Sequence, residues 1–242
     1  MSERVAIAEP RVFHRQGVGL IGVQAGSAIC PIPDPARIDI DCFRALMGTV
    51  VPFQPGRLIY SETDPADYLY VVMTGFVRGY RITSEGRRQI VAFYVPGDLF
   101  GFERGDDHTV SADAVNDVRL KMIKRAVAMG AAARDQSVGR QLWDALAAEQ
   151  YRDQEHIVRL GKSARQRVAS FLLELSRRSP AAGRNGLPMS RQDIADHLDL
   201  TIETVSRMLT QLKSVSAIAI ADARRITIRN TIALERLASD AE

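Results

Sequence analysis

Cysteine is scarce in this sequence, with only Cys30 and Cys42 among 242 residues. Two thiols cannot form the multi-pair disulfide framework of small secreted domains, so we expect a reducing, intracellular compartment. Long apolar runs are missing as well, because none approaches the ~20 residues that a membrane-spanning helix needs. The N-terminal residues lack the basic start and apolar core of a signal peptide. The sequence therefore predicts a cytoplasmic protein with no membrane partner.

The signatures of catalysis are also missing. The sequence contains no catalytic-triad arrangement, no phosphate-binding G-x-x-x-x-G-K-[ST] and no paired metal ligands. We predict that no histidine forms a close pair with another histidine or a cysteine, and that His197 lies at the surface or packs between helices. The histidines are His14, His108, His156 and His197. We therefore expect no enzyme activity, metal or cofactor, with haem or metal ligation by one histidine as the alternative.

Charge is unevenly distributed along the chain. The net charge is +3, but residues 162–229 hold twelve Lys or Arg against six Asp or Glu, a local charge of +6 that leaves −3 for the remainder. A basic C-terminal part beside a slightly acidic remainder suggests a polyanionic partner for the basic part. The alternative is a solvated basic face.

The patterns divide the chain into four segments. Residues 1–45 show no sustained period and predict an N-terminal arm. Residues 46–135 contain short β-favouring runs between turns, with Gly75 and Gly86 where a positive φ is needed, which is typical of a β-roll or barrel. The expected strands span residues 56–62, 68–75, 76–82, 88–95 and 118–123. With the helices that follow, the expected fold class is α+β.

Residues 136–161 predict a long helix without internal proline. An a/d-type stripe that is apolar at its ends and polar in the middle runs through Trp143, Leu146, Gln150, Asp153, Ile157 and Leu160. Such a stripe favours a homodimeric coiled-coil seam with polar positions inside it. Packing of the helix on its own domain is the alternative.

Residues 162–242 predict a winged helix-turn-helix. Helices are expected over 164–179, from the N-cap Ser190 to Leu198, and from the cap Thr201 onward, with a loop over 180–188 and a hairpin over 218–230. A small residue, Ala195, and a short bend at Asp199 fit the tight crossing of two helices. The apolar positions that fix this crossing are Ile194, Leu198, Leu200, Val205 and Met208.

The second helix of this motif carries the candidate base-reading residues Glu203, Ser206 and Arg207, whose i, i+3, i+4 spacing puts them on one face. Arg can donate two hydrogen bonds to guanine, Glu can accept from an amino group, and Ser can do either. The alternative is an intrahelical Glu203–Arg207 ion pair. Phosphate contacts are expected from the two helix starts, through Ser190, Arg191, Gln192, Thr201 and Thr204. Arg224 and Arg225 in the turn of the hairpin could contact DNA as a wing, and a solvated turn is the alternative.

With these motifs, the sequence resembles the CRP/FNR family of bacterial regulators, and within it the FixK-like branch. The similarity runs from about Gly56 to Asn230 and includes GRLIYSETDPADYLYVVMTGFVRGYRITSEGRRQIVAFYVPGDLFG, SARQRVASFLLELS and SRQDIADHLDLTIETVSRMLTQL. The resemblance implies a cyclic-nucleotide-binding-type β-roll, a long dimer helix and a winged helix-turn-helix. It implies that E-x-x-S-R reads TTGAT-type inverted repeats in double-stranded DNA, which Ile202 and Ser206 support against TGTGA half-sites.

The resemblance further implies an activator that contacts RNA polymerase at microaerobic, respiratory, denitrification or nitrogen-fixation genes. The family's effector sites are missing: there is no G-E-L cassette, and His108–Thr109 stand where Arg-Ser binds the cyclic phosphate. Cys30 and Cys42 are too few for a four-cysteine iron–sulfur cluster. We predict neither ligand, and expect ordinary thiols rather than redox switches. The alternative function is a sensor of the same fold gated by haem, nitric oxide or a small molecule.

Overall fold

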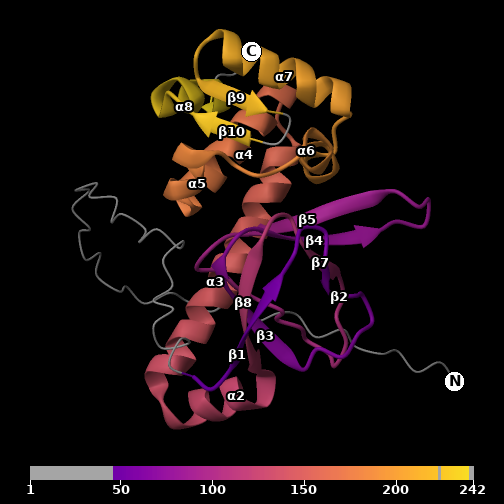
Figure 1. The fold of residues 1–242 in the computed structure, drawn as a ribbon, viewed down its shortest axis with the longest axis vertical. Coiled ribbons are helices and arrows are strands. Elements are labelled where there is room, and N and C mark those ends of the chain that lie inside the picture. Colours follow the sequence, from indigo (N-terminus) through magenta and orange to yellow (C-terminus); the bar gives the residue numbers. More distant parts are fainter. Residues whose placement is uncertain (1–45, 223–224, 240–242) are drawn as a thin grey trace, which may run out of the picture. The chain divides into compact units, whose positions relative to one another are not determined.

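The computed structural model describes residues 46–222 and 225–239. The expectations for the arm 1–45, with Cys30, Cys42 and His14, and for Arg224 lie outside this part of the chain. The described residues pack as one unit. They confirm the expected α+β architecture of a β-roll, a long helix and a C-terminal winged helix-turn-helix (Figure 1).

The β-roll consists of two four-stranded antiparallel sheets, with strand orders β1-β8-β3-β6 and β2-β7-β4-β5. The strands are β1 Thr49–Phe53, β2 Leu58–Tyr60, β3 Tyr68–Thr74, β4 Val77–Ile82, β5 Arg88–Tyr94, β6 Leu99–Phe100, β7 Ser111–Ala114 and β8 Val118–Lys124. The five expected strands are present. Sequence patterns missed β1, β6 and β7, of which β6 and β7 are too short to show a period of two.

Alternating apolar residues of the two sheets form the core of the roll, where Tyr70, Val72, Phe100 and Leu120 are buried. The tight turns are confirmed at both expected glycines, since φ is 85° at Gly75 and 76° at Gly86. A Cβ at Gly75 would lie 2.3 Å from the carbonyl oxygen of Asp117, so any side chain would open this turn.

Two helices follow the roll, α2 Arg125–Arg134 and α3 Gln136–Leu160. Asp135 separates them, because its extended backbone ends α2 while its carboxylate accepts from the N–H of Ser137 and caps α3. The inner face of α3 packs on the roll through Val138, Leu142 and Ala145.

The C-terminal part contains α4 Ala164–Arg178, α5 Pro180–Asn185, α6 Arg191–Leu198, α7 Ile202–Ser214, the hairpin β9 Ile218–Asp222 with β10 Arg225–Ile228, and α8 Thr231–Ser239. The expected loop over 180–188 is wrong in part, because Pro180 starts the short helix α5 at a position where a missing N–H costs nothing. Helix α8 was not expected. Its Leu234 is buried in the same core as Phe171 and Leu172 of α4. The segment limits 46–135, 136–161 and 162–242 stay predictions.

Candidate nucleic-acid interface

Helices α6 and α7 form the helix-turn-helix, and local side-chain bonds fix both helix starts. The Ser190 hydroxyl accepts from the N–H of Asp193 at 3.0 Å, and Asp193 accepts in return from the N–H of Ser190 at 3.2 Å. Thr201 caps α7 by accepting from the N–H of Thr204 at 3.2 Å. Asp199 adopts the left-handed conformation at the bend, with φ 51° and ψ 53°. Both expected caps and the expected bend are confirmed.

The crossing of the two helices is held by buried apolar side chains. Ile194, Ala195 and Leu198 of α6 are at most 1% exposed, as is Val205 of α7. Leu200 and Met208 pack against this cluster while keeping part of their surface exposed. The small side chain of Ala195 permits the close approach. Tertiary packing therefore turns the outer face of α7 away from the protein core.

The outer face of α7 carries Glu203 and Arg207, which are both exposed, and Ser206, which is half-buried. Within the part of the chain that the structure describes, Glu203 and Arg207 form no ion pair. The Arg207 guanidinium instead lies 3.4 Å from the Thr204 hydroxyl, and Arg191 of α6 donates to the Ser206 hydroxyl at 3.3 Å. The three candidate base-reading residues thus share one solvent-facing surface, and Arg191 joins it.

The candidate phosphate contacts stand at the two helix starts, as expected. Ser190 and Thr201 are the N-caps, and Arg191 is the first residue of α6. Gln192 donates to the Asp196 carboxylate at 2.6 Å, an exposed bond that a phosphate could replace. The N–H groups of a first helical turn have no intrahelical acceptor, so both starts can donate to phosphate. In the wing, Arg225 begins β10.

The outer face of α3 leaves large apolar side chains in solvent. Trp143 is 71% exposed, Ile157 70% and Leu146 43%, whereas Leu160 is half-buried. The polar stripe residues Gln150 and Asp153 between them are exposed too. Trp143, Leu146 and Ile157 of the predicted stripe thus lie on a face of α3 that its own domain leaves exposed.

A cavity of about 280 Å³ lies between the β-roll and α3. Glu103 in its wall accepts from both the N–H and the hydroxyl of Thr109, each at 3.0 Å. The buried His108 ring stacks on Tyr60 at 3.6 Å, and burial lowers its pKa. Burial also raises the pKa of Glu149 to about 7 beside the Tyr94 hydroxyl. Three carboxylates, those of Glu103, Glu149 and Asp153, line this cavity against one cation, Arg81, which donates to the Thr109 carbonyl at 2.6 Å. A cyclic phosphate would need the opposite balance of charge.

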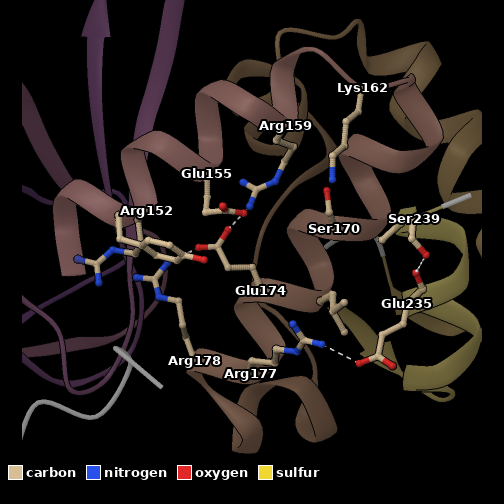
Figure 2. A pocket seen from close by; sticks show the side chains of 13 residues that line it. Arg152, Glu155, Arg159, Lys162, Ser170, Glu174, Arg177, Arg178, Glu235 and Ser239 are labelled. Atoms are coloured by element: carbon tan, nitrogen blue, oxygen red, sulfur yellow. Dashed lines mark hydrogen bonds and ion pairs between the residues drawn. The ribbon is translucent and has the colours of Figure 1, made fainter. Parts of the chain in front are cut away.

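A larger cavity of about 560 Å³ lies among α3, α4 and α8 (Figure 2). Three of its four arginines are held by carboxylates of the same wall. Arg159 bonds to Glu174, which also accepts from Arg178 at 3.0 Å, and Arg177 pairs with Glu235 at 2.7 Å. The fourth, Arg152, lies 3.8 Å from Asp98, so each guanidinium of this cavity has a carboxylate neighbour.

Sequence reasoning missed two features around α6. The expectation that no histidines pair closely is wrong, because the rings of His156 on α3 and His197 on α6 stack at 4.3 Å. His197 is buried and packs between helices, and it donates from Nδ1 to the carbonyl of Ile90 at 3.0 Å if that nitrogen carries the proton. The carboxylates of α6 also pair with arginines of the β-roll. Both features join residues about 40 to 115 positions apart, which no local pattern reveals.

Two properties of the described residues concern membranes and metals. None of the helices in that part is both long and apolar enough to cross a membrane. The same residues contain no group of three or more His, Cys, Asp or Glu placed to hold a metal ion.

Comparison with known proteins matches both halves of the chain. Residues 50–135 match the model of the cyclic nucleotide-binding domain, and residues 166–237 match that of the Crp-like helix-turn-helix domain. The chain is 44% identical to the nitrogen fixation regulation protein FixK of Azorhizobium caulinodans over 81% of each chain. It is 43% identical to FixK of Rhizobium meliloti over 78% of this chain and 86% of that protein. The structure of FixK2 from Bradyrhizobium japonicum is similar, with a TM-score of 0.75 and 44% identity, covering 81% of this chain and all of that one.

Proposed function

The chain belongs to the CRP/FNR family and is a FixK-like transcription regulator with a DNA-binding helix-turn-helix, and on this premise we propose that it binds TTGAT-type inverted repeats as a homodimer. In this proposal Arg207, Glu203 and Ser206 read bases in the major groove. Ser190, Arg191, Gln192, Thr201 and Thr204 contact phosphates on either side.

One observation carries the proposal: the outer face of α7 exposes Glu203 and Arg207 without pairing them to each other. An intrahelical ion pair would have occupied the groups that must reach base edges. The guanidinium, which makes only a long bond to Thr204, can donate to O6 and N7 of guanine, and the Glu203 carboxylate can accept from cytosine or adenine. The capped helix starts beside them supply donors for phosphate.

The homodimer is supported by the exposed face of α3. Trp143 and Ile157 are large apolar side chains that are mostly exposed to solvent, which is typical of a surface that contacts another protein. Together with Leu146 they follow coiled-coil spacing. A parallel pair of such helices would bury them and set two helix-turn-helix units side by side. Two-fold symmetry of the protein would then match an inverted repeat in the DNA.

The targets we propose follow from the relatives, two of which are named nitrogen fixation regulation proteins. We propose that this chain activates nitrogen-fixation, denitrification or other microaerobic genes in the cytoplasm, in contact with RNA polymerase. The relatives are named as regulators, which agrees with a function other than catalysis.

The proposal is tested by titrating the purified protein into a labelled TTGAT/ATCAA inverted repeat and into a scrambled repeat of equal composition, at several salt concentrations. We expect specific binding about 10³-fold tighter or more than scrambled binding, and affinity that falls steeply with salt. Equal affinity for the two duplexes would refute sequence-specific binding. Sedimentation of the protein alone should give a dimer, and Ile157→Glu should give a monomer.

A second candidate function is a ligand-gated regulator, which the 280 Å³ cavity beside α3 favours. Its carboxylate-rich wall suits a neutral or cationic molecule rather than a phosphate. A coloured purified protein, or a small molecule that changes the affinity for the repeat, would support this candidate over regulation by protein amount alone.

A further inference from the structure

The first helix of the helix-turn-helix is tied to the β-roll by evenly spaced carboxylates. Asp193, Asp196 and Asp199 follow one another at intervals of three residues. Asp193 accepts from Arg78 at 2.6 Å and from Arg88 at 2.7 Å, and Asp196 pairs with Arg88 at 2.8 Å. Asp199 pairs with a third arginine, Arg87, at 3.0 Å. All three arginines belong to the β4–β5 hairpin or its turn, so one hairpin contacts the whole length of α6.

Burial separates the inner pairs from the outer one. The side chains of Arg78, Asp193 and Asp196 are 15%, 5% and 11% exposed, whereas Arg87 and Asp199 are 63% and 58% exposed. Exposed pairs contribute little, but pairs shielded from water and bonded at several atoms hold a defined geometry. Arg78 is itself fixed from behind by Asp113 of β7 at 2.6 Å. We call Arg78, Arg88, Asp193 and Asp196 the hairpin–α6 clamp.

Further contacts support the same junction. The ring of His197 on α6 packs against Phe93 of β5 with ring centroids 5.2 Å apart. From α4, Arg178 donates to the carbonyl of Phe93 at 2.8 Å and to Asp98 at 2.6 Å. Phe93 and Ile90 of β5 belong to the same buried cluster as Ile194 and Leu198 of α6. The clamp therefore lies at the edge of an apolar contact, which excludes water from one side of it.

The clamp closes without covering the recognition face. Glu203 and Arg207 stay exposed while the clamp bonds are made, and Ser190 and Arg191 begin the helix that the clamp holds. Asp193 belongs both to the clamp and to the cap of α6, because it also accepts from the N–H of Ser190. The contacts are thus compatible with DNA binding, and they fix the element that presents α7.

We propose that Arg78 and Arg88 are positioning residues for DNA binding, which hold the helix-turn-helix at one orientation on the β-roll through Asp193 and Asp196. A dimer must place two recognition helices about 34–36 Å apart to meet successive major grooves. A helix-turn-helix free to rock on its domain spends only part of its time at that separation. Its apparent affinity falls by that fraction, and its preference for one half-site spacing weakens.

This inference rests on the proposed dimeric DNA binding, and its test uses two substitutions of opposite charge. Arg88→Gln removes a positive charge and Asp196→Asn removes a negative one, and both break the Arg88–Asp196 pair. Affinity is measured for the inverted repeat and for the same repeat with one base pair inserted between its half-sites. Arg119→Gln, an exposed arginine on β8 of the same domain, is the matched control.

We expect each clamp variant to bind the correctly spaced repeat about fivefold more weakly, as a loss of about 1 kcal/mol would give. We also expect each to lose part of the discrimination against the inserted base pair. The double variant should be no worse than Arg88→Gln, which alone breaks both the Arg88–Asp196 and the Arg88–Asp193 bonds. Arg119→Gln should retain the wild-type discrimination. Far-UV circular dichroism and urea unfolding verify that the variants are folded.

Several outcomes would overturn the inference. Opposite changes in affinity for Arg88→Gln and Asp196→Asn would assign the effect to net charge near the phosphates. Tighter binding by both variants would mean that the clamp holds the motif away from DNA. Unchanged affinity and spacing preference in both would leave the clamp without a role. Wild-type protein that fails to distinguish the inverted repeat from a scrambled one would refute the proposed function instead, whatever the variants do.

Discussion

The recognition face of α7 and the cavity of the β-roll are both polar, yet their side chains are used in opposite ways. In the cavity wall, Glu103 is bonded by both polar groups of Thr109, and Glu149 is bonded by Tyr94. On α7, Glu203 has no bonded partner within the described residues, and Arg207 reaches only the Thr204 hydroxyl at 3.4 Å. A polar group already paired inside the fold must lose that bond before it can bind anything else, whereas an unpaired one can bind at once.

The most demanding test of this comparison is Arg207→Ala. Because Arg207 is exposed and makes one long internal bond, its removal should leave the free energy of unfolding almost unchanged. The free energy of binding to the inverted repeat should become about 1–3 kcal/mol less favourable, and selectivity for the contacted guanine should be relaxed. Binding to repeats with each base substituted measures both effects.

Arg236→Ala is the control, since Arg236 is an exposed arginine on α8, the helix that packs on α4. A similar loss of affinity in this variant would show that overall charge, rather than base contact, explains the effect of Arg207.

Glu103→Ala in the cavity wall should have the opposite effect to Arg207→Ala, with a loss of stability rather than of DNA affinity. The Glu103 side chain is 7% exposed, and its loss leaves the N–H and hydroxyl of Thr109 without their acceptor. We expect the free energy of unfolding to fall by about 1–2 kcal/mol, measured in urea, with DNA affinity within about twofold of wild type. Glu85→Ala in the exposed turn of the β4–β5 hairpin should change neither quantity. A stable Glu103→Ala protein with impaired DNA binding would reverse the comparison.

A third polar group, His197, extends the comparison to the interior. Burial lowers its pKa well below the usual 6.5, and the neighbouring His156 lowers it further. The unfolded chain binds a proton near pH 6.5 and the folded chain does not. The contribution of His197 to the free energy of unfolding is therefore fully present above pH 6.5. It decreases as the pH drops below 6.5, by at most about 1.4 kcal/mol per pH unit.

Urea unfolding at several pH values between 7.5 and 5.5 measures the slope of the free energy of unfolding against pH. His197→Asn keeps a donor for the carbonyl of Ile90 but does not titrate, so its slope should be smaller. Other groups contribute to the slope in both proteins. Burial lowers the pKa of His156 and His108, which adds to the slope, and raises the pKa of Glu149 to about 7, which opposes it. Identical slopes in the two proteins would show that His197 does not contribute.

The smallest expected effect is that of cyclic AMP. A ligand present at 100 times its Kd would raise the free energy of unfolding by about 2.7 kcal/mol. Because three carboxylates and one arginine line the cavity, and His108–Thr109 stand where Arg-Ser would bind the phosphate, we expect no change in melting temperature with added cyclic AMP. A rise that depends on its concentration would mean that the cavity accepts a phosphate despite its carboxylates.

Local signals made much of this molecule predictable from its sequence. The caps Ser190 and Thr201 and the left-handed bend at Asp199 depend on neighbours within a few residues, and each has the expected geometry. The exposed apolar face of α3 followed from helical spacing alone. The roles of Glu203, Ser206 and Arg207 in reading DNA stay predictions.

The remaining features depend on contacts between distant segments. Arg88 and Asp196 are 108 residues apart, and neither hairpin nor helix pattern indicates that they meet. His156 and His197 were missed for the same reason. Helix α5 begins at Pro180 in a segment rich in turn-forming residues, where local composition favoured a loop. It ends before Gly186, whose φ of 109° does not continue a helix, and Leu187 just beyond it pairs with Ile226 of β10.

Asp193 has a consequence for anyone who recombines domains of such regulators. One carboxylate caps α6 and also receives both Arg78 and Arg88, so the helix-turn-helix contains a residue whose surroundings belong half to another domain. A chimera that grafts residues 162–242 onto a foreign β-roll would leave that carboxylate buried without its arginines. Transplanting Arg78 and Arg88 together with the helices restores the match. The helix-turn-helix can therefore be joined to another β-roll only if that roll carries the equivalents of Arg78 and Arg88 for Asp193 to bind.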